Sequence, residues 1–105
     1  MRSRDEQIEI ANTIIKQLGG HRFVVMTGAK HIFAHESGVS FRVPGTMTKN
    51  RINYVKITLN TMDTYDIEFK RIYGLKVKDI SDFSGAYCDM LQEVFTKETG
   101  LNTHL

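Results

Sequence analysis

The chain has 105 residues, of which 41% are hydrophobic and 25% are charged. This is typical of one globular domain with one core, so we expect residues 1–105 to form a single domain. No apolar run approaches the length of a membrane span, and the amphipathic N-terminal stretch does not predict a signal peptide, so no membrane partner is expected. The single cysteine, Cys88, excludes an internal disulfide and a cysteine-rich zinc site and favours a reducing cytoplasm.

The first predicted element is a helix over residues 4–18. Ser3 and Glu6 have the spacing of a capping box, in which two side chains satisfy free backbone groups at a helix start. Apolar residues then recur every three or four positions until Gly19-Gly20, which predicts the end of the helix.

Strands are predicted next, because the apolar period changes from 3.6 to 2. Residues 21–27, rich in Phe and Val, predict a strand, followed by a tight turn at Gly28-Ala29. Further strands are predicted over residues 30–34, 39–43, 52–59 and 64–72, the last with a short continuation over 75–78. One alternating set is expected to face the helices: Val55, Ile57, Leu59, Tyr65, Ile67 and Phe69. The other is expected on an open face: Arg42, Tyr54, Lys56, Asp66, Glu68 and Lys70.

A second helix is predicted over residues 82–98, with an apolar stripe that includes Tyr87, Leu91 and Phe95 and with Cys88 buried inside it. Short connections favour antiparallel pairing. We therefore expect an α+β fold, with an antiparallel sheet of about five strands and the N-terminal and C-terminal helices packed on one face.

Residue patterns that carry enzyme chemistry are weak. His31 and His35 are too far apart along a strand to share one metal ion. Asp66 and Glu68 are explained by charge pairing with lysines across the sheet. Cys88 has no sequence feature that would activate a thiolate. We expect a protein that is not an enzyme and has no metal or cofactor.

Basic residues concentrate in the middle of the chain. Residues 21–60 contain six lysines and arginines against Glu36 alone, a net charge of +5, whereas residues 61–105 contain five basic and eight acidic residues, a net charge of −3. The basic stretch is either an ordinary solvated face or a surface for phosphate or an acidic partner. For nucleic acid, phosphate contacts and base stacking by Tyr54 predict this site: Arg42, Lys49, Arg51, Tyr54 and Lys56.

Three segments, 23–30, 52–65 and 93–101, resemble small uncharacterised proteins of bacteriophage and mobile-element origin. They read Phe-Val-Val-Met-Thr-Gly-Ala-Lys, then Ile-Asn-Tyr-Val-Lys-Ile-Thr-Leu with Asp-Thr-Tyr, and Glu-Val-Phe-Thr-Lys-Glu-Thr-Gly-Leu. The resemblance implies a phage-type accessory protein made in a bacterial cytoplasm, and it carries over no functional residues. We expect a binding module whose target is nucleic acid or, with nearly equal weight, a host or defence protein that it inhibits; its oligomeric state stays open.

Overall fold

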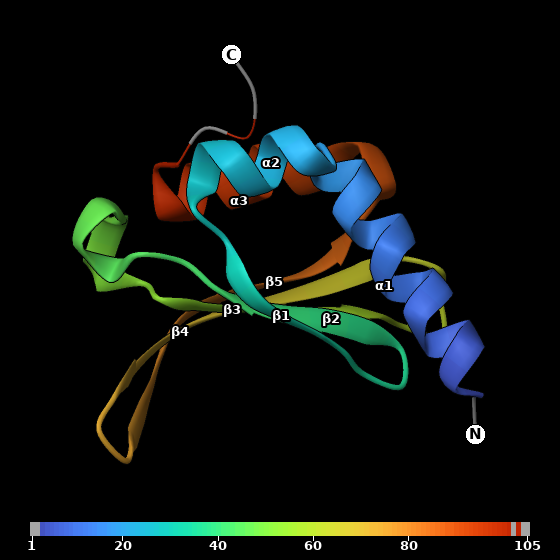
Figure 1. Cartoon of the computed structure of the whole chain (residues 1–105), viewed down its shortest axis with the longest axis horizontal. Coiled ribbons are helices and arrows are strands. Elements are labelled where there is room, and N and C mark those ends of the chain that lie inside the picture. Colours follow the sequence, from blue (N-terminus) through green and yellow to red (C-terminus); the bar gives the residue numbers. More distant parts are fainter. Residues whose placement is uncertain (1–2, 102, 104–105) are drawn as a thin grey trace.

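In the computed structural model, which describes residues 3–101 and 103, an antiparallel five-stranded sheet lies against a layer of helices (Figure 1). The predicted α+β class is confirmed. The strands lie in chain order from β1 to β5, and each pairs antiparallel with the next. No helix among the described residues is long and apolar enough to cross a membrane.

Helix α1 (Arg4–Leu18) begins and ends where the sequence predicts. The backbone N–H of Glu6 donates to Ser3 Oγ at 3.2 Å, and Gly19 ends the helix with a backbone N–H on the carbonyl groups of Ile15 and Lys16. Ala11, Ile14 and Leu18 are buried against the sheet. The predicted stripe is therefore the face that covers the core.

The apolar residues of β3 and β4 face the helices, as the sequence predicts. Its strands are β1 (Lys30–Ala34), β2 (Gly38–Arg42), β3 (Tyr54–Leu59), β4 (Tyr65–Tyr73) and β5 (Lys76–Ala86). The apolar residues of β3 and β4 lie opposite one another and face the helices: Val55 with Phe69, Ile57 with Ile67, and Leu59 with Tyr65. Lys56 and Glu68 pair on the opposite face, which the helices do not cover (Figure 1).

The strand predicted over residues 21–27 is wrong, because these residues form helix α2 (His21–Thr27). Phe23 and Thr27, one helical turn apart, are buried, whereas Val25 between them is exposed. The ring of Phe23 packs edge-on against those of Phe41 and Phe95, each at 5.3 Å between centroids. Packing of one aromatic residue thus outweighs the preference of the Val-rich segment for a strand.

The start predicted for the second helix is also wrong. Strand β5 continues to Ala86, the 3₁₀ helix η3 spans Cys88–Met90, and helix α3 spans only Leu91–Thr99. The polar residues at 79–84 belong to an edge strand with one side in solvent, where polar residues are common. Consequently Cys88 is exposed rather than buried, and Tyr87 is 63% exposed and outside the apolar stripe of α3.

Candidate functional site

Basic side chains collect at one end of the sheet. In an antiparallel sheet whose strands follow chain order, the odd-numbered strands start and the even-numbered strands finish at the same end of the sheet. At this end of the sheet, all five strands or the residues next to them contribute a basic side chain. We call these residues the basic end: Lys30, Arg42, Arg51, Arg71, Lys76 and Lys78. At the opposite end of the sheet, the acidic end, lie Glu36, Asp63 and Asp66. The charge of the molecule is therefore polarised along the strands.

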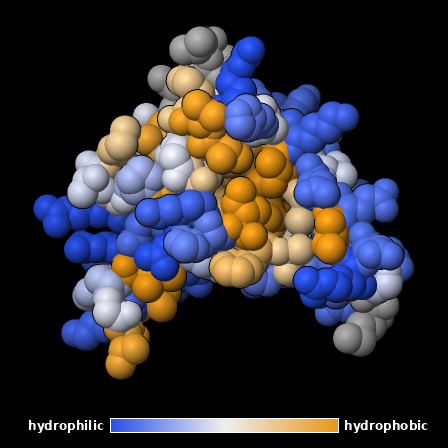
Figure 2. Space-filling view, in the orientation of Figure 1, coloured by the Kyte–Doolittle hydropathy of each residue, from blue (hydrophilic) through white to orange (hydrophobic). Residues whose placement is uncertain are grey.

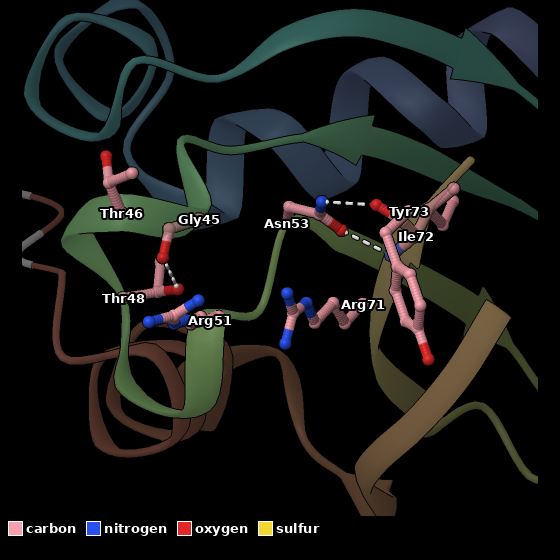
Figure 3. Close-up of a pocket in the computed structure, with 8 residues that line it drawn as sticks. All are labelled: Gly45, Thr46, Thr48, Arg51, Asn53, Arg71, Ile72 and Tyr73. Atoms are coloured by element: carbon pink, nitrogen blue, oxygen red, sulfur yellow. Dashed lines mark hydrogen bonds between the residues drawn. The ribbon is translucent and has the colours of Figure 1, made fainter. Parts of the chain in front are cut away.

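A hollow of about 590 Å³ lies at the basic end, between the loop that precedes β3 and the last residues of β4 (Figure 3). The side chain of Arg71 extends across it toward the loop that carries Arg51 (Figure 3). Its other lining residues are Gly45, Thr46, Thr48, Asn53, Ile72 and Tyr73, so no carboxylate lines it. Among the described residues, both recorded ion pairs belong to Lys70, and these two arginines are left without an acidic partner.

Hydrogen bonds fix both walls of this hollow. The side-chain amide of Asn53 donates to Ile72 O at 2.8 Å and accepts from Ile72 N at 2.7 Å, as a strand backbone would, and so holds the end of β4. On the other wall, Thr48 Oγ1 donates to the carbonyl oxygens of Gly45 and Ile52, at 3.2 and 2.6 Å. The walls are preorganised, which lowers the entropy cost of holding a ligand between them.

Backbone strain is present at Arg51. The 3₁₀ helices η1 (Gly45–Met47) and η2 (Lys49–Arg51) form the loop, and Asn50 and Arg51 are consecutive residues with positive φ, 54° and 57°. A non-glycine residue in this conformation costs about 1–2 kcal/mol, and arginine gains nothing from it locally. Strain of this kind makes the solvent-exposed Arg51 a candidate for a functional role.

The β4–β5 hairpin adds more positive charge beside the hollow. Arg71 lies opposite Lys78 and Tyr73 opposite Lys76 in the strand register, so these four side chains share one face of a two-stranded ribbon. Like charges directly opposite one another destabilise a sheet. The guanidinium of Arg71 also lies over the ring of Tyr73, 4.9 Å from its centroid. An anion between these cations would relieve the repulsion.

A second hollow of about 350 Å³ adjoins the first and shares Gly45 and Asn53 with it. It brings Lys30, His31 and Arg42 together, again without a carboxylate in its lining. Arg42 donates from Nε to Asn53 O at 3.1 Å, which anchors the guanidinium while its terminal nitrogens carry no recorded bond among the described residues. The two hollows form one basic surface around Asn53.

The structure separates the five residues predicted as a binding site. Arg51 and Arg42 reach the two hollows, but Lys49 does not: its Nζ donates to Lys97 O at 3.0 Å and its stem lies against Gly100, so it stabilises the end of α3. Tyr54 and Lys56 lie on the open face, half-buried in the rows between Arg42 and Lys70 and between Ser40 and Glu68.

Four of the six residues of the basic end are absent from the predicted site: Lys30, Arg71, Lys76 and Lys78. Arg71, Lys76 and Lys78 belong to the part of the chain whose net charge is negative, and dividing the chain into large segments hid them. A shorter window would have found them, because residues 70–78 contain four basic residues and no acidic one. The structure joins this run to the basic segment 42–51.

The open face carries compensated charge instead. Lys70 Nζ contacts Asp79 at 3.0 Å and Glu68 at 3.6 Å, and the hydrogen bond that Lys70 donates to Asp79 raises the pKa of Lys70. His35 Nε2 lies 2.6 Å from Ser40 Oγ, and Ser40 is only 2% exposed, so this pair fixes the connection between β1 and β2 to strand β2. Among residues 3–101 and 103, no group of three or more His, Cys, Asp or Glu side chains could hold a metal ion.

Comparison with known proteins adds no relative: no protein-family model, curated protein or solved structure matches the chain.

Proposed function

We propose that this domain binds nucleic acid through the basic end of its sheet. One observation carries the proposal: two basic segments that are far apart in sequence, 42–51 and 70–78, meet around hollows that no carboxylate lines. Unpaired arginines held in fixed positions are the usual ligands of phosphate, because the planar guanidinium can donate two parallel hydrogen bonds to its oxygens.

A nucleic-acid backbone fits this surface better than a single small anion does. The cations continue from Lys30 and Arg42, past Arg51 and Arg71, to Lys76 and Lys78, so several phosphates in a row would find partners. Such contacts provide most of the affinity of sequence-independent binding. A phage-type accessory role in a bacterial cytoplasm, with viral or host nucleic acid as the target, is the setting that we propose for this activity.

Fluorescence anisotropy tests the proposal. Labelled single-stranded and duplex DNA and RNA are titrated with the protein at about 50 and 200 mM salt, where phosphate contacts weaken steeply. We expect Arg51→Ala and Arg71→Ala each to weaken binding about tenfold, which corresponds to about 1.4 kcal/mol.

Two matched variants serve as controls. Arg4→Ala removes the same charge at the start of α1, and Lys56→Ala removes a cation from the open face. Both should bind like the wild type. Absence of binding to every probe at the lower salt concentration would contradict the proposal, and an equal loss in all four variants would show that overall charge, rather than the basic end, attracts the ligand.

A protein partner is the second candidate, and one surface favours it. Strand β1 is an edge of the sheet and is exposed along its whole length, with Phe33 61% and Ile32 41% exposed. A hollow of about 390 Å³ separates it from α1 and is lined partly by Ile8, on a face where apolar side chains gather (Figure 2). A partner that adds an extended strand to β1 would use both features. Phe33→Asp should abolish such pairing without affecting nucleic-acid binding.

A further inference from the structure

We propose that the β4–β5 hairpin is an arm that enters a groove of duplex DNA and places Leu75 as an apolar wedge between base pairs. This rests on the proposed function and names the kind of nucleic acid. The arm comprises residues 71–78, and it extends away from the rest of the sheet as the orange hairpin at the lower left of Figure 1.

The tip of the arm is apolar where a tight turn is usually polar. Tyr73 and Lys76 pair across a two-residue turn in which Gly74 has a φ of 60° and Leu75 is fully exposed, at 105%. Val77 beside it is 59% exposed, and Figure 2 shows apolar side chains at the far end of the arm among hydrophilic ones. Leu75 buries nothing within the chain and Val77 stays more than half exposed, so folding does not explain an apolar tip.

Charge identifies the partner of this tip. Residues 71–78 include Arg71, Lys76 and Lys78 and no acidic residue, and the three cations share the ribbon face that borders the hollow of Arg51. An apolar tip with cations on both strands beside it is complementary to stacked bases and the phosphates that flank them.

Duplex DNA fits the arm better than a single strand does. The major groove of duplex DNA is wide enough to admit a two-stranded ribbon. Aliphatic side chains act as wedges that partly unstack a base step and kink the duplex, whereas proteins that hold single strands stack bases on aromatic rings. The one ring of the arm, Tyr73, already has the guanidinium of Arg71 over it.

A kinked duplex can be measured directly. A duplex of about 20 base pairs carries a donor and an acceptor dye at its ends and 2-aminopurine near its centre. Binding of the wild type should bring the ends closer and raise 2-aminopurine fluorescence, because the probe unstacks. Leu75→Ala should still bind, through Arg51 and Arg71, but should lose both signals.

Met62→Ala is the matched control. Met62 is also an exposed apolar residue at a turn, 81% exposed, but it lies between β3 and β4 at the opposite end of the sheet. It should kink the duplex as the wild type does. Since Leu75 buries nothing, its truncation should leave the unfolding transition unchanged, which separates loss of the wedge from loss of the fold.

The outcomes distinguish the two proposals. Duplex binding without a kink, or a kink that survives in Leu75→Ala, would overturn the wedge and leave nucleic-acid binding in place. Preference for single strands would overturn the arm's role in a groove. No binding to any nucleic acid, or binding only to anionic phospholipid vesicles, would overturn both.

Discussion

Single residues at the edges of the fold carry roles that their type does not reveal. Arg51 and Lys49 are two positions apart in a basic loop, yet Lys49 bonds the carbonyl of Lys97 in α3 while Arg51 is held in a strained conformation at the hollow. Lys49 stabilises the fold, whereas Arg51 lines the hollow at the basic end. From composition alone, Lys49 and Arg51 are both predicted to bind a ligand, and only the path of the loop shows that their roles differ.

The strain at Arg51 gives a prediction in which stability and binding change in opposite directions. Arg51→Gly removes the cost of a positive φ for a side chain, about 1–2 kcal/mol, and introduces the entropy cost of glycine, about 0.5–1 kcal/mol. The variant should be as stable as the wild type or up to about 1.5 kcal/mol more stable, yet should bind DNA about tenfold more weakly. Urea unfolding and anisotropy measure the two effects. A variant that is less stable and binds normally would contradict a functional role for this strain.

His35 should make stability depend on pH. Burial, with a contribution from the nearby Lys56, lowers the pKa of His35 below its ordinary value of 6.5. Below pH 6.5 the unfolded chain therefore binds a proton that the folded protein does not, and the free energy of unfolding falls as the pH drops through this window. Stability contributed by the neutral form is complete above pH 6.5.

His35→Gln isolates this effect, because glutamine can still hydrogen-bond Ser40 and does not titrate. Between about pH 7.5 and pH 5.5, on either side of the ordinary histidine pKa, the wild type should lose more stability than the variant does. Urea unfolding at both pH values measures the difference. Equal losses would show that His35 titrates normally in the folded protein.

At the scale of elements, helices α2 and α3 end in the same way. In each, a threonine hydroxyl donates to the carbonyl of a phenylalanine four residues earlier, and accepts from the N–H of a buried residue two positions on: Phe23, Thr27 and Ala29 in α2, and Phe95, Thr99 and Leu101 in α3. The glycine between, Gly28 or Gly100, has a positive φ of 72° or 78°. The repeated pattern is Phe-x-x-x-Thr-Gly followed by an apolar residue.

This pattern yields a prediction for stability. Thr27→Val keeps the shape of the side chain but removes the acceptor of the buried Ala29 N–H, and an unsatisfied buried group costs about 1–3 kcal/mol. Thr13→Val is the control, because Thr13 makes the same bond to the carbonyl of Glu9 on the exposed side of α1. It should cost less than about 0.5 kcal/mol. Similar losses in both variants would contradict a special role for the cap.

Much of the fold could be predicted from sequence where local pattern and tertiary packing agree. The limits of α1 follow from its caps, and the register of β3 on β4 follows from alternation over six residue pairs. Helix α2 could not be found by period, because its seven residues give only two buried positions, Phe23 and Thr27. The shared ending with α3 was the available signal. The strand predicted over 75–78 was too short, because an exposed edge strand such as β5 resembles a loop in composition.

The site was predictable only in part, for a topological reason. The basic loop around Arg51 was visible in the sequence. Arg71, across the hollow, lies 20 positions later in the chain, and only the antiparallel pairing of β3 with β4 brings it close to this loop. Pairing in an antiparallel sheet brings alternate turns to one end, so charge that is scattered along the chain becomes concentrated in space. The direction of Lys49 toward α3 depends on tertiary packing that no local pattern encodes.

For the molecule as a whole, the central claim is that nucleic acid binds at one end of a sheet that is polarised along its strands. Backbone amide chemical shifts, followed by NMR while unlabelled duplex DNA is added, test where the ligand lies. The account predicts that the largest shift changes fall in residues 45–53 and 70–78, with little change at 60–66, the acidic end. Changes centred on Tyr54, Lys56 and Glu68, on the open face, or on Ile32 and Phe33, beside α1, would contradict it.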